Sequence, residues 1–276
     1  ARGRGRRARY TGRRAARSRY LGLLARAGFA ARGVLYAIIG CLAVGMAFGH
    51  SSDQADSAGA VRLVAATPVG LIALWLLLAG FAGLALWRLS EAAYGGPGPG
   101  EHKPSSRLAA LGKAVVYGVL AFTIAKYAIG AGAPKSGNQQ SADLTASVLH
   151  HPGGQVVVVV VGLAFVAGGG YVACSSWRRD FLEQLNLAGA SQRSRRIARW
   201  LGQVGGIARG AVFAAVGVFL IVAGVKSQPD QAKGIDSALR VFAQTPLGPW
   251  LLVVVAAGLV TFGLYSWCEA RWRKVS

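Results

Sequence analysis

The sequence predicts an all-α integral membrane protein, with six transmembrane helices in three homologous hairpin repeats and short external amphipathic helices. Three observations lead to this prediction. The 276 residues are 53% hydrophobic although they carry a formal net charge of +21. Six apolar runs approach the roughly 20 residues that a helix needs to cross a bilayer. A motif that joins a basic residue to a following apolar run occurs three times.

The six apolar runs lie at about 33–49, 68–89, 112–131, 153–175, 207–225 and 246–268. They are continuous rather than alternating, which favours helices over the strands of a barrel. Of the 31 Lys and Arg residues, 25 flank the runs on one side and 6 lie on the other. The excess of positive charge predicts that the 25, and both termini, are cytoplasmic in a multi-pass protein of the cell membrane.

Each repeat of about 70 residues begins with a basic residue, which an aromatic residue follows four positions later. The basic residues are Arg32, Lys113 and Arg209, and the aromatic residues are Tyr36, Tyr117 and Phe213. A Pro-x-Gly sequence precedes the second helix of each repeat, at Pro68, Pro152 and Pro246. Glu91 and Glu269 lie 23 residues after the first and third proline, whereas the second repeat has Ser175 there. The second repeat is therefore the degenerate one.

The repeats divide the chain into six parts. These are a basic cytoplasmic arm at 1–25, repeat 1 at 26–94, a Gly/Pro-rich linker at 95–106, repeat 2 at 107–177, a basic cytoplasmic connection at 178–199 and repeat 3 at 200–272. The external segments 56–68, 142–152 and 235–246 have apolar residues at helical spacing, which predicts short interfacial helices capped by residues such as Asp143 and Asp236. Gly206, Gly210 and Ala214 predict close helix packing.

This pattern resembles a family of bacterial membrane proteins known as a domain of unknown function with three tandem two-helix repeats. The resemblance covers roughly residues 26–270. Its carriers are Ala31-Arg32-Gly33 with Tyr36 and Gly40, the Pro-x-Gly turns, and the stretch LALWRLSEA at 84–92. The resemblance implies the fold and a membrane location. It implies no activity, so no catalytic residue is carried over from it.

The repeated base and the repeated acid are expected on the same side of the membrane, at the two ends of one hairpin. The sequence therefore predicts two structural ion pairs, Arg32 with Glu91 and Arg209 with Glu269, which would fix the register of hairpins or of neighbouring repeats. Lys113 is left as the unpaired repeat equivalent. A charged cytoplasmic vestibule is the alternative interpretation of the same residues.

No catalytic, cofactor-binding or metal site is predicted. Cys41, Cys174 and Cys268 stand alone in apolar runs, without the Cys or His spacing that is typical of a metal site. The sequence shows no nucleophile–base constellation, so an enzyme is not expected. The middle of the predicted spans is almost free of ionisable groups, which argues against ion-coupled transport.

Nine of the first twenty residues are Arg, and none is acidic. Seven of them, Arg2, Arg4, Arg6, Arg7, Arg9, Arg13 and Arg14, are predicted to contact anionic lipid or a protein partner, with nucleic acid the less favoured partner. The lead interpretation is a non-catalytic accessory or scaffold subunit that interacts with the anionic lipids of the bilayer and with protein subunits of a larger membrane complex. The alternative is a transporter or carrier of a small apolar or lipidic molecule.

Overall fold

The computed structural model describes residues 19–48, 55–95, 104–132, 135–232, 234, 236–237, 239 and 248–274. Within these residues the structure is helical and contains no β-strand. The six long helices are α2 (Arg19–Ala47), α4 (Gly70–Tyr94), α5 (Pro104–Ala128), α7 (Gly154–Arg178), α8 (Gln192–Lys226) and α10 (Gly248–Trp272). Each contains a segment long and apolar enough to cross a membrane. The predicted all-α fold with six spans is confirmed.

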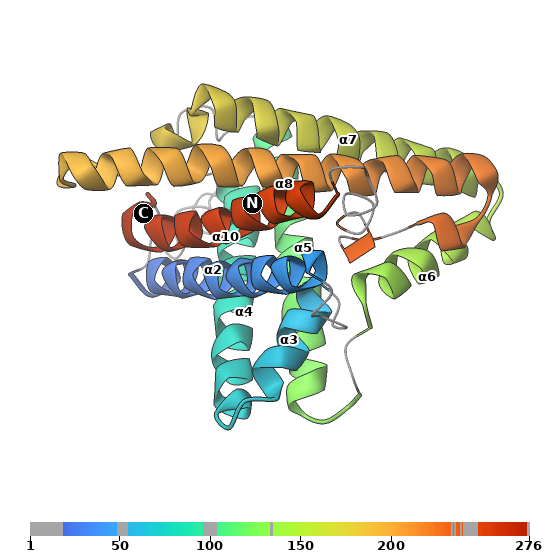
Figure 1. Ribbon diagram of the computed structural model, residues 1–276, viewed down its shortest axis with the longest axis horizontal. Helices are drawn as coiled ribbons and strands as arrows, with labels where there is room; N and C mark the ends of the chain where they lie inside the picture. Colours follow the sequence, from blue (N-terminus) through green and yellow to red (C-terminus); the bar gives the residue numbers. More distant parts are fainter. Residues whose placement is uncertain are drawn as a thin grey trace, which may run out of the picture.

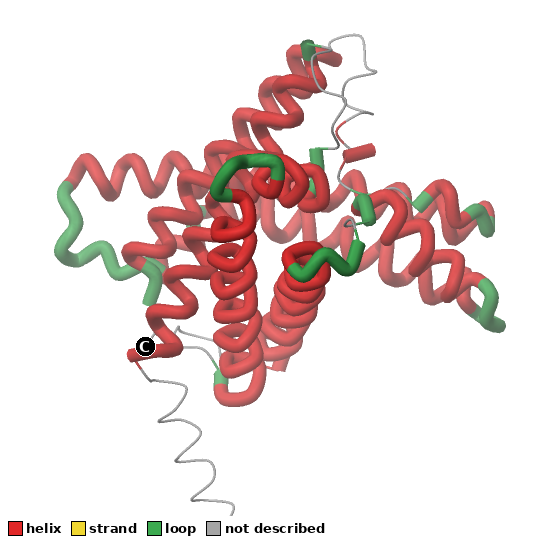
Figure 2. Tube along the Cα trace, turned by 90° about the horizontal axis from the view of Figure 1, so that it is seen from below, coloured by secondary structure: helices red, strands yellow, loops and turns green. Residues whose placement is uncertain are grey.

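The long helices associate in three close pairs, and each pair joins the second helix of one repeat to the first helix of the next. α4 packs on α5, α7 on α8, and α10 on α2, so the last repeat closes a circle with the first. Contacts of α2 with α4 and of α8 with α10 link the pairs, whereas α5 and α7 hardly touch within the described residues. In Figure 1, α2, α10, α8 and α7 are stacked and α4 and α5 run across them; Figure 2 shows the helices splaying outward.

Small residues set the distance between α7 and α8. A Cβ atom built on Gly169 would lie 2.6 Å from the carbonyl oxygen of Gly210, and a Cβ atom on Gly210 would lie equally close to the carbonyl oxygen of Gly169. One turn earlier, Gly206 lies against Ser176. Only residues without a large side chain allow two helix backbones to come this close. The predicted packing role of Gly206 and Gly210 is confirmed.

The helices that carry the repeated bases begin well before those bases. α2 starts at Arg19, and its early residues Ala25 and Phe29 are fully buried. Leu and Ala, which dominate this stretch, are strong helix formers. Arg32 consequently lies inside a membrane-length helical segment, and so do Lys113 and Arg209. These three helices therefore extend beyond the predicted apolar runs at the end where the bases lie.

Two of the three external segments form complete short helices, α3 (Ser57–Ala65) and α6 (Gly137–Leu149). α3 is capped by Asp56, whose side chain accepts from the backbone N–H of Gly59. α6 starts earlier than predicted because Ser136 and Gln139 form a capping box, so Asp143 is an interior residue of the helix rather than its cap. In the third segment, residues 236, 237 and 239 are helical, and the rest of 235–246 lies outside the described residues.

A ring of hydrogen bonds joins the starts of these three segments. The backbone N–H of Gly137 donates to Asp56 Oδ2 (2.7 Å), that of Gly234 to Asn138 Oδ1 (2.7 Å), and that of Ala55 to Asp236 Oδ1 (3.0 Å). In each bond the acceptor belongs to one repeat and the donor to the next, in the same cyclic order as the helix pairs. Both aspartates are buried. The circle of repeats is thus closed at this end by polar contacts.

Candidate functional site

The contact between α2 and α10 buries an arginine with a complete set of acceptors. Arg32 and Glu269, which are 4% and 3% exposed, form an ion pair through Arg32 Nη2 and Glu269 Oε2. Arg32 Nε donates to Ser266 Oγ (3.1 Å), and Arg32 Nη1 donates to the hydroxyl of Tyr117 on α5 (3.3 Å). This base is therefore held by one helix from the third repeat and one from the second.

Two further arginines complete the buried charges at this end of the helices. Arg273 Nη1 binds Glu269 Oε1, four residues back along the chain. On α4, Arg88 Nη1 lies 2.7 Å from Glu91 Oε2, and both side chains are buried. Glu269 thus forms ion pairs with two arginines, whereas Glu91 pairs with Arg88 of its own helix.

The pairing differs from the one that the sequence predicted. Arg32 pairs with Glu269, not with Glu91, because α2 meets α4 in a different register: Gly80 and Ala31 are in contact, so α4 reaches the level of Arg32 near residue 80. Arg209 is likewise out of register with Glu269, since α10 presents Gly258 to Ala208. The acid that ends the third repeat pairs instead with the base that begins the first.

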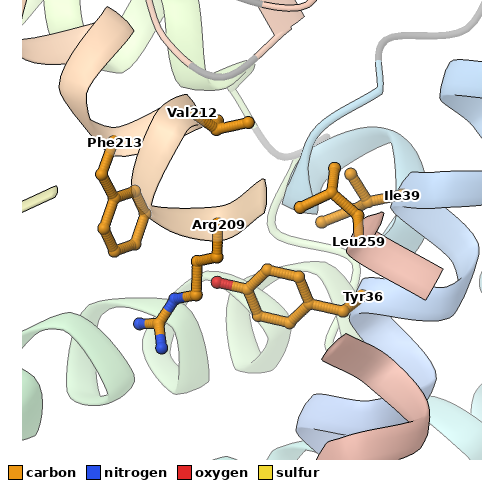
Figure 3. Close-up of a pocket in the computed structure, with 6 residues that line it drawn as sticks. All are labelled: Tyr36, Ile39, Arg209, Val212, Phe213 and Leu259. Atoms are coloured by element: carbon orange, nitrogen blue, oxygen red, sulfur yellow. The ribbon is translucent and has the colours of Figure 1, made fainter. Parts of the chain in front are cut away.

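Arg209 lies among aromatic rings without a carboxylate partner in the described part of the chain. Its guanidinium carbon is 4.8 Å from the ring centre of Phe213, 4.9 Å from that of Phe262 and 5.8 Å from that of Tyr36. Its Nε atom is buried and has no hydrogen-bond partner. Figure 3 shows the side chain passing between Phe213 and Tyr36, with the guanidinium directed away from the aliphatic residues of the small pocket beside it.

Four guanidinium groups and three aromatic rings alternate across the site. Phe262 lies between Arg209 and Arg32, Phe29 between Arg32 and Arg273, and Trp87 between Arg273 and Arg88, with each guanidinium carbon 4.4–5.2 Å from the ring centres beside it. We call this series the arginine ladder: Arg209, Arg32, Arg273 and Arg88 with their three rings. Cation–π contacts of this kind stabilise a charge that has left water, but they do not neutralise it.

The arginine ladder carries more positive than negative charge. Its four guanidinium groups are permanently protonated, and among the described residues the carboxylates that bind them are Glu91 and Glu269. Lys113 adds a further charge from α5, one helical turn before the Tyr117 that accepts from Arg32. The Lys113 side chain is exposed, and it makes no hydrogen bond or ion pair with the described residues.

Sequence reasoning missed Arg88, Arg273 and Ser266. A signal for the first two was present, because Arg88 precedes Glu91 by three residues and Arg273 follows Glu269 by four, which are the spacings of ion pairs on one helix face. Nothing in the spacing marked Ser266 as an acceptor for Arg32. The arm residues Arg2, Arg4, Arg6, Arg7, Arg9, Arg13 and Arg14 lie outside the described residues.

Metal-ligating side chains and enclosed space are both scarce in the described residues. They contain no group of three or more His, Cys, Asp or Glu side chains that could hold a metal ion. The pocket beside Arg209 is lined by Tyr36, Ile39, Arg209, Val212, Phe213 and Leu259, and its volume of about 10 Å³ admits about one water molecule. The site is thus a buried positive charge with little enclosed space.

Comparison with known proteins agrees with the three repeats. The Domain of Unknown Function (DUF1206) matches the chain three times, at residues 27–95, 108–179 and 204–273. The chain is similar to the uncharacterized protein YxxB of Bacillus subtilis (strain 168), with 28% identity over 243 residues that cover 87% of each protein. No solved structure matches the chain. Because the three matches together span most of the sequence, the protein belongs to the DUF1206 family, and its apolar helices make it a membrane protein of that family.

Proposed function

We propose that this protein is a non-catalytic, multi-pass membrane protein that binds anionic phospholipid and serves as an accessory or scaffold subunit. The observation that supports the proposal is the excess of arginine over glutamate in the arginine ladder. An arginine that is removed from water needs an opposite charge, because its attraction to aromatic rings offsets only part of the cost of desolvation. The phosphate of an anionic lipid is the counter-charge most abundant at a membrane surface.

The distribution of charge along the sequence supports the same proposal. Along the sequence, 25 of the 31 basic residues flank the apolar runs on the side predicted to hold both termini. An asymmetry of this kind favours the cytoplasmic side of a cell membrane, where basic segments are attracted to anionic lipid. We therefore place both termini in the cytoplasm and assign the basic arm to lipid or to the acidic surface of a partner subunit.

The test is lipid analysis of the full chain after purification from bacterial membranes in a mild detergent. We expect anionic phospholipid to be retained and enriched over zwitterionic phospholipid, because the latter carries no net charge to neutralise the arginines. A retained lipid fraction with the composition of the bulk membrane would overturn the lipid proposal. A second protein in stoichiometric amount is the expected sign of an accessory subunit, and its absence from cross-linked membranes would overturn that part.

A variant that lacks residues 2–18 separates the arm from the helices. This deletion removes eight arginines but none of the described residues. We expect its melting temperature to equal that of the full chain, while its binding to anionic vesicles weakens and loses part of its salt dependence. Binding to anionic vesicles that is unchanged by the deletion would contradict the role assigned to the arm.

A further inference from the structure

We propose that Lys113 and Arg209 together bind a phosphate group, which takes the place of a carboxylate that the second repeat lacks. This inference rests on the proposed function and adds to it the site and the chemistry of recognition. It starts from the equivalence of the three repeats, in which Arg32, Lys113 and Arg209 occupy the same position.

The two helix pairs that hold Arg32 and Arg209 are packed in the same register. Gly33, which follows Arg32, lies against Gly263 and Trp267 of α10. Gly210, which follows Arg209, lies against Gly169 and Ala173 of α7. Gly263 and Gly169 both lie 17 residues after the proline of their repeats. The residues of α7 that face Arg209 are therefore the repeat equivalents of the residues of α10 that face Arg32.

Those positions hold acceptors on α10 and none of equal strength on α7. Arg32 uses Ser266 and Glu269, which lie 20 and 23 residues after Pro246. The residues 20 and 23 positions after Pro152 are Val172 and Ser175. Valine has no acceptor, and the Ser175 hydroxyl donates to the backbone carbonyl of Val172 (3.2 Å). The replacement of both acceptors accounts for the buried Nε of Arg209 that no group satisfies.

The second base of the site lacks a carboxylate for a different reason. The acid that precedes Lys113 in the cyclic order of repeats is Glu91, and this carboxylate binds Arg88 on its own helix at 2.7 Å. Lys113 lies one helical turn before Tyr117, whose hydroxyl accepts from Arg32 (3.3 Å), and the guanidinium carbons of Arg32 and Arg209 lie 5.1 and 4.9 Å from the centre of the Phe262 ring. Lys113 and Arg209 therefore border the same buried cluster, and neither forms an ion pair with a carboxylate of the described residues. Like charges beside one buried cluster repel each other, and an anion bound between them removes that repulsion.

The chemistry of the two side chains favours a phosphate over a single carboxylate. A guanidinium offers a planar pair of N–H donors and an ammonium offers a compact charge, and a phosphate has enough acceptor oxygens for both. The hydroxyl of Tyr117, which accepts from Arg32, keeps its own proton available for a further bond. The 10 Å³ pocket beside Arg209 is too small for a phosphate, so the group approaches from the exposed side chain of Lys113 on α5.

The phosphate comes either from a lipid headgroup or from solution, and the experiment distinguishes the two sources. The full chain, purified in a zwitterionic detergent, is titrated with inorganic phosphate and, separately, with mixed micelles that contain phosphatidylglycerol, while the melting temperature is followed. We expect the protein to be stabilised by at least one of these. Stabilisation by phosphatidylglycerol alone assigns the site to a headgroup, and stabilisation by inorganic phosphate alone assigns it to a soluble anion. Stabilisation by neither overturns the proposal.

Three variants and one control test the residues. Ser175→Glu restores the missing carboxylate, so we expect it to melt at a higher temperature without added anion and to lose the response to anion. Arg209→Gln and Lys113→Gln should each weaken anion binding about tenfold or more, since each removes a charge-assisted hydrogen bond. Lys126→Gln removes an equal charge from the far part of α5 and should respond like the natural protein.

An unchanged anion response in Ser175→Glu and in Arg209→Gln would overturn this site. That result leaves the proposed function intact if anionic phospholipid is still enriched in the purified protein. Loss of the enrichment from the natural protein would instead overturn the proposed function, whatever the variants do. If Arg209→Gln fails to fold, Ser175→Glu decides the question alone, because it keeps every base in place.

Discussion

Glu269 should be the most costly single carboxylate to neutralise in this protein. It binds both Arg32 and Arg273, and all three side chains are buried. Glu269→Gln keeps the shape of the side chain, but it leaves two buried guanidinium groups without their shared counter-charge. Breaking a buried ion pair by removing one partner costs about 3–5 kcal/mol, so we expect the free energy of unfolding to fall by at least about 3 kcal/mol.

Two matched variants serve as references for the loss of unfolding free energy in Glu269→Gln. Glu91→Gln strands only Arg88 and should cost less than Glu269→Gln. Glu183→Gln changes an exposed carboxylate and should leave the free energy of unfolding within about 0.5 kcal/mol of the natural value. Unfolding is followed in mixed micelles with increasing sodium dodecyl sulfate, where the fluorescence of the seven Trp residues reports on the fold.

A double variant tests the same reasoning, because it should be more stable than the single variant Glu269→Gln. Arg32→Met in the Glu269→Gln background removes one of the stranded charges and replaces it with an apolar side chain. We expect the double variant to be more stable than Glu269→Gln alone, since an apolar residue costs less than an unpaired buried charge. A Glu269→Gln variant as stable as Glu183→Gln, or a double variant less stable than the single one, would refute the account of this site.

Three further predictions follow from the fold. Asp56→Ala should lower the free energy of unfolding by about 1–2 kcal/mol or more, because it removes the cap of α3 and the acceptor for the Gly137 N–H. The matched variant Asp143→Ala breaks only the exposed ion pair with Lys135, so it should lower the free energy of unfolding by less than about 1 kcal/mol in the same assay. Gly169→Ala should cost about 1–3 kcal/mol by forcing α7 away from α8, whereas Gly168→Ala meets open space and should be neutral or stabilising. A cysteine in place of Ser194 should react with a membrane-impermeant thiol reagent only after the cells are opened, as the distribution of basic residues predicts; labelling of intact cells would reverse the orientation.

The fold was predictable from the sequence because membrane spans and repeats leave strong local signals. A run of about 20 apolar residues is rare in a soluble protein, so it predicts a membrane span. The recurrence of a basic residue at Arg32, Lys113 and Arg209 identified the three repeats. The boundaries were less predictable. α2 starts at Arg19, well before its apolar run, because amphipathic helical residues such as Arg26 precede the run without interrupting the helix.

The partners in the site were not predictable because they depend on how the repeats close on each other. Sequence order suggests that the two helices of one hairpin pack along their lengths, and from that arrangement Arg32 should meet Glu91. In the structure the pairs are shifted by one helix, and α10 returns to α2, so Arg32 meets Glu269. A circular closure is a property of the whole chain, and the spacing within one repeat contains no information about it.

The degenerate repeat gives the protein its asymmetry. In a circle of three equal repeats each base would be neutralised by the acid of the preceding repeat, and the centre would have no charge left for a ligand. Ser175 breaks that pattern at Arg209, and the bond from Glu91 to Arg88 breaks it at Lys113. Stability alone would favour an apolar residue in place of a base that has lost its acid, because an unpaired, partly buried charge lowers the free energy of unfolding. The combination of two unmatched bases with an intact fold around them is therefore what a site for an external anion requires, and the same combination has no structural benefit of its own.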